Sequence, residues 1–150
     1  MTHELSIELT LDAPAEKLFR CYTDPKLLQK WFAPEPWTIK SVDIDPRAGG
    51  RMSFVMASPD GQEYPNSGLY LEVVPNRKIV TTDAVTPDFK PSGPFMIAEV
   101  TFEDLGNGKT RYRAVARHWN EETMKQHQEM GFEPGWTQTA RQLEALARKI

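Results

Sequence analysis

The last nineteen residues of the chain, 132–150, carry a pattern that restricts the fold more than any other segment. Five of them recur at spacings of four, three, four and three, which is one stripe of a helix with 3.6 residues per turn. These residues are Trp136, Ala140, Leu143, Ala147 and Ile150. Nearly everything between residues 37 and 118 is typical of strands. A single long amphipathic helix, with Pro134 in its first turn, must therefore lie across a large sheet.

The N-terminal third predicts a strand followed by two short helices. Apolar and polar residues alternate from Leu5 to Asp12, which is the pattern of a half-buried strand. Asp12 is then expected to cap a helix whose apolar face includes Leu18 and Tyr22. The sequence Thr-Asp-Pro at 23–25 predicts the start of a second short helix, which ends before two closely spaced prolines.

The next eighty residues predict an antiparallel meander, because hairpin signals separate successive strands. The predicted strands are 37–45, 51–58, 68–74, 78–84, 95–104 and 109–118. Three prolines and a glycine predict a long loop at 85–94, and residues 120–130 have helical propensity. A sheet of this size needs one face covered, and the final helix is the obvious cover.

Alternation within the strands assigns side chains to the face that this helix covers. The assigned set combines alanines with aromatic, methionine and polar side chains, which is unusual for a close-packed core. It predicts a ligand-binding cavity lined by Trp37, Met52, Phe54, Met56, Tyr70, Met96, Ala98, Tyr112, Ala114, Ala116, His118, Trp136, Ala140 and Leu143. The alternative is that Trp136, Leu143 and the methionines fill the space as an ordinary core.

Composition argues against several classes of partner. The net charge of −3 does not suggest a nucleic-acid surface, and the apolar runs are too short to span a membrane. The single cysteine, Cys21, agrees with a reducing compartment, so we expect a cytoplasmic protein. Cys21 itself is interpreted as a small buried residue. We expect no cofactor, because neither a metal-binding motif nor a phosphate-binding glycine loop is present.

Catalytic residues cannot be assigned from the sequence, but His118 is the best candidate. It ends a strand on the inward face, where a carboxylate such as Glu72 could pair with it for acid–base chemistry. The alternative is a hydrogen-bonded residue at the cavity rim. Glu122 and His127 follow at spacings of four and five, which is unconvincing for a metal, so they are interpreted as surface residues.

Two further clusters have open interpretations. Arg47 and Arg51 flank a Gly-Gly turn beside Asp43 and Asp45, as an exposed ion-pair cluster or as a basic portal for a ligand carboxylate. The aromatic group Trp31, Phe32 and Trp37 predicts an end cap of the sheet, a cavity mouth or a dimer surface.

Five short motifs spread along the chain resemble one known family. They are Trp31-Phe-Ala-Pro, Asp45-Pro-Arg-Ala-Gly-Gly-Arg, Pro59-Asp-Gly, Gly68-Leu-Tyr-Leu-Glu-Val-Val-Pro and Gly135-Trp-Thr-Gln-Thr. In this order they resemble the START-like, birch-pollen-allergen-like (SRPBCC) superfamily. Within it, they are most similar to bacterial domains related to the activator of the heat-shock chaperone ATPase (AHSA-type domains).

The resemblance implies a single α+β helix-grip domain over residues 1–150. A curved antiparallel sheet of six or seven strands would wrap around the C-terminal helix, with two short helices after the first strand. Members of the superfamily include lipid carriers, polyketide cyclases and co-chaperones of the stress response. We therefore expect binding of a small hydrophobic or aromatic ligand between sheet and helix. The alternatives are a cyclase- or hydrolase-type enzyme, which we favour less, and a chaperone-interacting module; a homodimer is a further expectation.

Overall fold

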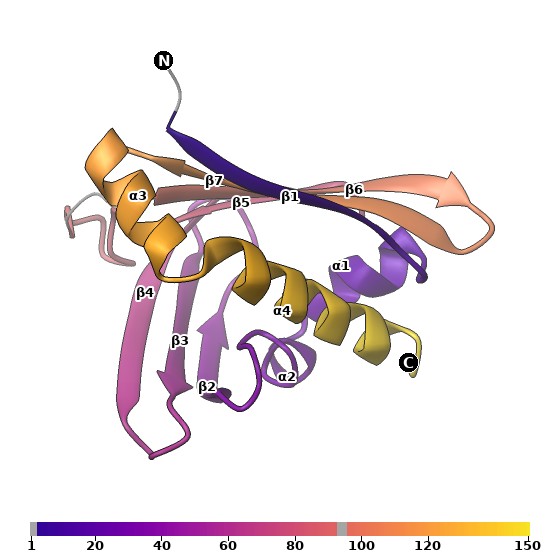
Figure 1. Ribbon diagram of the computed structural model, residues 1–150, viewed down its shortest axis with the longest axis horizontal. Coiled ribbons are helices and arrows are strands. Elements are labelled where there is room, and N and C mark those ends of the chain that lie inside the picture. Colours follow the sequence, from indigo (N-terminus) through magenta and orange to yellow (C-terminus); the bar gives the residue numbers. More distant parts are fainter. Residues whose placement is uncertain (1–2, 93–95) are drawn as a thin grey trace.

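The computed structural model describes residues 3–92 and 96–150 and contains one curved antiparallel sheet (Figure 1). The strand order is β1-β7-β6-β5-β4-β3-β2. The strands are β1 (Glu4–Leu11), β2 (Thr38–Ile44), β3 (Arg51–Ala57), β4 (Glu63–Val74), β5 (Lys78–Thr82), β6 (Met96–Gly106) and β7 (Lys109–His118). The helices are α1 (Ala15–Thr23), α2 (Pro25–Leu28), α3 (Glu121–Glu129) and α4 (Phe132–Ala147). Helix α4 crosses one face of the sheet, which we call the inner face (Figure 1).

The predicted architecture is confirmed, with shifts at several boundaries. Strand β4 begins at Glu63 rather than 68, because it continues the pairing with β3 along the whole hairpin arm. Residues 121–129 form a regular helix, in which the side chain of Asn120 accepts from the backbone N–H of Thr123 at 2.8 Å. Residues 93–95 of the predicted loop and strand lie outside the described residues. In the described part of the chain, no helix is long and apolar enough to cross a membrane.

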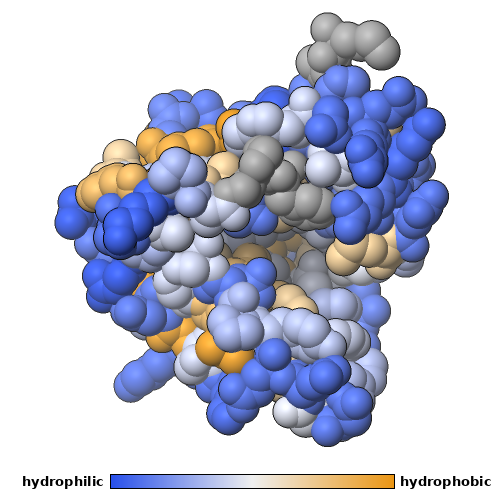
Figure 2. Space-filling view, turned by 90° about the vertical axis from the view of Figure 1, so that its left-hand side faces the viewer, coloured by the Kyte–Doolittle hydropathy of each residue, from blue (hydrophilic) through white to orange (hydrophobic). Residues whose placement is uncertain are grey.

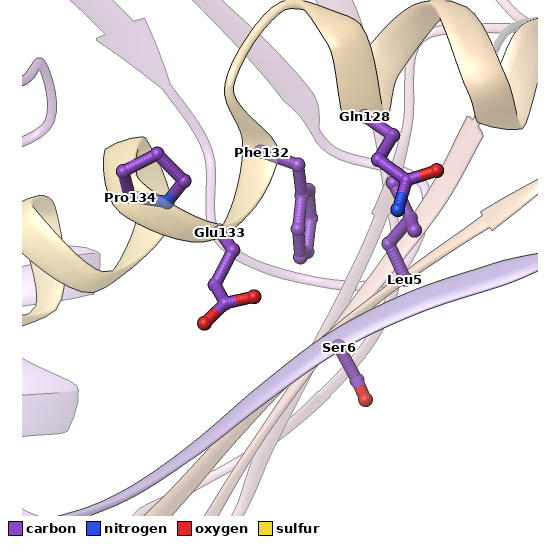
Figure 3. A pocket seen from close by; sticks show the side chains of 6 residues that line it. All are labelled: Leu5, Ser6, Gln128, Phe132, Glu133 and Pro134. Atoms are coloured by element: carbon purple, nitrogen blue, oxygen red, sulfur yellow. The ribbon is translucent and has the colours of Figure 1, made fainter.

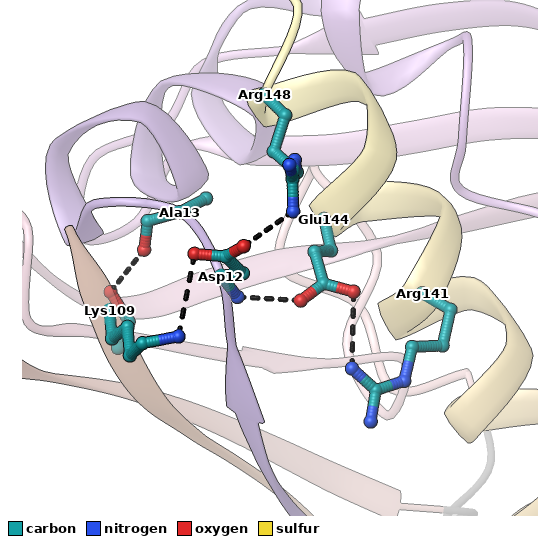
Figure 4. A network of polar contacts seen from close by, with 7 residues as sticks. Asp12, Ala13, Lys109, Arg141, Glu144 and Arg148 are labelled. Atoms are coloured by element: carbon teal, nitrogen blue, oxygen red, sulfur yellow. Dashed lines mark hydrogen bonds and ion pairs between the residues drawn. The ribbon is translucent and has the colours of Figure 1, made fainter.

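The prediction that Asp12 caps the first helix is wrong. Helix α1 begins at Ala15 and receives no hydrogen bond from a capping side chain. Asp12 instead forms ion pairs with Lys109, at 3.6 Å, and with Arg148, while its backbone N–H donates to Glu144 (Figure 4). These contacts attach the end of α4 to the end of β1. Because the side chains are exposed, each ion pair contributes about 1 kcal/mol or less.

Aromatic rings fill one end of the space between the sheet and α4. The ring of Tyr22 lies 4.7 Å from that of Trp31 and 5.7 Å from that of Phe102, both in edge-on geometry. The indole N–H of Trp31 donates to the carbonyl oxygen of Cys21 at 3.0 Å, and Trp31 is only 2% exposed. Trp31 is therefore a core residue, and the expectation that it lines a cavity mouth or a dimer surface is wrong.

The second half of α4 is bound firmly to the segment that follows α2. The side-chain amide of Gln142 donates to the carbonyl oxygens of Trp31, at 2.9 Å, and of Ala33, at 2.7 Å. Its oxygen accepts from the backbone N–H of Glu35 at 3.0 Å. The first half of α4 follows directly on Gly131, whose φ of 89° turns the chain between α3 and α4.

The sheet bends in β4. A β-carbon on Gly68 would lie 2.0 Å from the carbonyl oxygen of Thr82, so only glycine allows β5 to approach this closely. Beyond this point the register shifts between Tyr70 and Glu72, which is a β-bulge. As a result Glu72 faces solvent and pairs with Lys78 at 2.8 Å, and the expectation that Glu72 could pair with His118 on the inward face is wrong.

Candidate functional site

The positions predicted to line a cavity divide into a buried group and a half-buried group. The buried group consists of Met52, Tyr70, Tyr112, Ala114, Ala116, His118, Ala140 and Leu143. The half-buried group consists of Trp37, Phe54, Met56, Met96, Ala98 and Trp136. Trp37 lies against Tyr64, with ring centroids 5.5 Å apart, and Tyr64 pairs with Met56 across the hairpin. The buried group forms part of the closed core, whereas apolar surface remains accessible at the half-buried positions.

Small residues occupy the middle of the inner face. Ala116 of β7 pairs with Ala98 of β6, Ala98 pairs with Thr81 of β5, and Thr81 pairs with Tyr70 of β4. We call these four residues the alanine row. In the next row toward the end of β7, His118 pairs with Met96. Tyr70 is the one large side chain of the alanine row. Tyr70 and Ala116 at its two ends are buried, whereas Thr81 and Ala98 between them are half-buried.

The molecular surface is hollowed on the side where α3 and the β3–β4 hairpin arm lie. Figure 2 views this side and shows a hollow in its middle, with pale and orange residues inside and a mostly blue rim. Figure 1 shows that this is the end of the inner face where α3 meets α4. This end, which we call the open end, lies opposite helix α1, which carries Tyr22 (Figure 1).

Two further pockets are present. One, of about 250 Å³, is lined by Leu5, Ser6, Gln128, Phe132, Glu133 and Pro134. Figure 3 shows it between β1 and the start of α4, with Ser6 directed away from Phe132. The other, of about 310 Å³, lies around the exposed hydroxyl pair of Ser53 and Ser67 on β3 and β4. Neither pocket coincides with the cavity predicted from the sequence.

A buried histidine pair lies at the end of β7. The Nε2 atom of His118 is 2.8 Å from Nδ1 of His127, and Nδ1 of His118 is 3.0 Å from the carbonyl oxygen of His3. Because a carbonyl only accepts, Nδ1 of His118 carries hydrogen in this arrangement. When both rings are neutral, His127 therefore donates to His118. The interpretation of His127 as a surface residue is wrong, since it is 8% exposed.

Helix α3 and the start of α4 bury this pair. The ring of His127 lies 5.1 Å from that of Phe132 and 5.7 Å from that of Trp136. Burial, and to a smaller extent the charge of His118, lower the pKa of His127 to about 4. The sequence did contain a signal for this burial, because Thr123, Met124 and His127 fall on one helical stripe and are the less exposed positions of α3.

The buried state of His127 predicts a pH-dependent stability. Its pKa is about 6.5 when the chain is unfolded and about 4 when it is folded, so between these values only the unfolded state binds the proton. The stabilising contribution is present above pH 6.5 and is lost as the pH falls toward 4. We expect urea unfolding to show a loss of up to about 3 kcal/mol over this range. His127→Gln should flatten the profile; an unchanged slope would contradict the assignment.

Three tyrosines form a polar spot inside the core. The hydroxyl oxygens of Tyr22 and Tyr112 are 2.6 Å apart, and both rings are buried. The Tyr70 hydroxyl is also buried and has no hydrogen-bond partner among the described residues. Burial raises the pKa of all three phenols, so they stay neutral donors at physiological pH. Tyr22 belongs to α1 and was absent from the predicted lining.

The remaining sequence candidates are structural or exposed. Within residues 3–92 and 96–150, no group of three or more His, Cys, Asp or Glu side chains is placed to hold a metal ion. Cys21 is buried, which raises its pKa to about 11 and makes its thiol a poor nucleophile. Arg47 pairs with Asp45 at 2.7 Å and Arg51 with Asp43 at 2.8 Å, as expected for an exposed ion-pair cluster.

A curved antiparallel sheet closed by a C-terminal helix, with two short helices after the first strand, defines the α+β helix-grip fold. The chain belongs to the family described as Activator of Hsp90 ATPase homolog 1-like protein, which matches residues 12–148.

Solved structures agree with this family. Protein NE0264 from Nitrosomonas europaea is 38% identical, with a TM-score of 0.93, over 97% of this chain and 94% of its own. Protein Ms6760 from Mycobacterium smegmatis is 29% identical, with a TM-score of 0.81, over 97% and 90% of the two chains. Protein CV1439 from Chromobacterium violaceum is also 29% identical, with a TM-score of 0.76, over 95% and 96%. A comparison with curated proteins gave no match.

Proposed function

We propose that this protein binds a small hydrophobic or aromatic molecule between α4 and the inner face of the sheet. The observation that carries this proposal is the half-buried apolar group at the open end of that space. This group consists of Met96 and Ala98 of β6 and Trp136 of α4. Met96 pairs with His118, and the ring of Trp136 lies 5.7 Å from that of His127, the hydrogen-bond partner of His118. A pocket lined by aromatic and methionine side chains, with a few polar groups nearby, is typical of sites for small apolar ligands.

The surface available at this end sets a modest affinity. An aromatic group that becomes buried removes about 150–250 Å² from water, which is worth about 4–6 kcal/mol at about 25 cal/mol per Å². The corresponding dissociation constant lies at about 0.04–1 mM before specific polar contacts are added. A single buried cysteine agrees with a cytoplasmic setting, which we propose with the function.

Filling the alanine row tests the proposal. We expect Ala98→Leu to weaken binding of a hydrophobic naphthalene dye by about fivefold or more, because the added carbons occupy ligand space. Dye fluorescence in a titration measures the affinity. Ala145→Leu is the matched control, since Ala145 is exposed on α4 and the same substitution there leaves the inner face unchanged. Equal dye affinity in both variants and the wild type would remove the inner face as the binding site.

The family description favours a second candidate function, which is activation of a chaperone ATPase. Stimulation of ATP hydrolysis by a chaperone of the Hsp90 type would support it, and dye binding alone would not. The enzyme alternative depends on His118, whose expected partner Glu72 faces solvent on the other side of the β-bulge. His127 takes the place of that carboxylate.

A further inference from the structure

Tyr70 places a hydrogen-bond donor deep in the inner face. The residue is 2% exposed, and its hydroxyl group has neither donor nor acceptor partner among the described residues. Buried polar groups in folded proteins nearly always have a partner, so an exception needs an explanation. A group that enters the protein and accepts from this hydroxyl provides one.

The neighbouring phenols add a second donor. In the Tyr22–Tyr112 pair one hydrogen lies between the two oxygens, so the accepting phenol keeps its own hydrogen for another acceptor. Tyr70 contributes to the rise in the pKa of Tyr22, after burial and Tyr112, which places the Tyr70 phenol near the pair. The core therefore contains phenolic O–H groups in excess over their acceptors in the described part of the chain.

The local charge distinguishes between neutral and anionic acceptors. After burial, the negative charge of Asp45 is the second cause that raises the pKa of Tyr70. Asp45 is itself paired with Arg47, but the four residues of the alanine row carry no charge, so a carboxylate buried beside them would have no cationic partner in this row. A neutral oxygen is therefore the better acceptor. A ketone, ester or amide carbonyl has this property and accepts well from a phenol.

The position of Tyr70 connects this donor to the proposed binding space. Tyr70 is the large side chain of the alanine row, which runs through Thr81 and Ala98 to Ala116. A flat molecule that contacts the half-buried Ala98 and Thr81 would therefore have one end beside Tyr70. Building on the proposed function, we propose that the ligand is a neutral aromatic carbonyl compound whose oxygen accepts a hydrogen bond from Tyr70.

Two probes of nearly equal size test this assignment. 2-Acetylnaphthalene carries a carbonyl oxygen, and 2-ethylnaphthalene lacks it. We expect the wild type to bind the ketone about five- to tenfold more tightly, measured by quenching of tryptophan fluorescence. Tyr70→Phe should abolish this preference and leave the affinity for the hydrocarbon unchanged. Tyr64→Phe should retain the preference, since Tyr64 is 44% exposed on the hairpin arm.

The outcomes separate this inference from the proposed function. Binding of neither probe overturns the proposed function. Equal binding of both probes to the wild type overturns only the assignment of a carbonyl group to the ligand. Tighter binding of 2-naphthoate than of the ketone overturns the assignment of a neutral ligand. If Tyr70→Phe does not fold, the carbonyl stretching frequency of the bound ketone in the wild type decides, because a hydrogen bond lowers it and an unshifted band contradicts the inference.

Discussion

Replacement of Gly68 by alanine is expected to lower the free energy of unfolding by about 2–4 kcal/mol. The added β-carbon would lie 2.0 Å from the carbonyl oxygen of Thr82 and 3.0 Å from its carbonyl carbon. Both are backbone atoms of β5, so no side chain can rotate away to make room. Either β4 and β5 separate, which breaks their pairing, or the overlap strains both strands.

The damage should extend to the proposed binding space. Gly68 pairs with Met52, and the strand that follows it supplies Tyr70 to the alanine row. A shift of β4 away from β5 therefore moves Tyr70 relative to Ala98. We expect urea unfolding of Gly68→Ala to show a lower midpoint with a similar slope.

Gly135→Ala is the matched control for this prediction. Gly135 lies within α4, and a β-carbon there would meet nothing within 4 Å. Because alanine is the better helix former, we expect an increase in stability of about 0.5–1 kcal/mol. If Gly→Ala lowers the free energy of unfolding at position 68 and raises it at position 135, the loss is due to the close contact between β4 and β5. A loss at Gly135 as large as at Gly68 would contradict that explanation.

The elements that could be predicted from the sequence are those whose signal is local. The C-terminal stripe from Trp136 onward and the alternation in β7 each repeat over several turns or residue pairs, and both elements occur as predicted. The face of Glu72 could not be predicted in this way. A β-bulge shifts the alternation by one residue, so every side chain beyond it changes face.

Other predictions were wrong because the residues make contacts with distant segments of the chain. Asp12 is well placed in sequence to cap a helix, but it lies beside Arg148 and Lys109 in the folded chain and pairs with them instead. His127 is surrounded by polar residues in sequence, yet α3 presents it to His118 and Trp136. In both cases tertiary contacts decided between local options of similar free energy.

Only part of the candidate site could be predicted from the sequence, for the same reason. Inward alternation identified Tyr70, Ala98 and Ala116 as neighbours on one face. It could not show that Tyr22 of α1 closes one end of the space, because no strand pattern involves that helix. Whether small residues produce a cavity or a core depends on which distant rings enter the space.

The second large effect is expected for Trp31→Ala, which should lower the free energy of unfolding by about 3–5 kcal/mol. Trp31 packs edge-on against Tyr22 and Phe32, and its indole N–H is bonded to the carbonyl oxygen of Cys21. Removal of the ring leaves a large cavity and an unpaired carbonyl. Trp31→Phe keeps most of the ring volume, so we expect it to lose about 1–2 kcal/mol, mainly for the hydrogen bond.

Trp119→Ala is the control, because Trp119 is 48% exposed and buries less of its ring; we expect a change below about 1 kcal/mol. Thermal and urea unfolding of the three variants give the comparison. A similar loss for Trp31→Ala and Trp119→Ala would mean that Trp31 does not hold the closed end of the fold. A large loss of stability confined to Trp31→Ala would mean that the Trp31-Phe-Ala-Pro motif is needed for packing. The same motif also holds α4 on the sheet, because the carbonyl oxygens of Trp31 and Ala33 accept hydrogen bonds from the side-chain amide of Gln142.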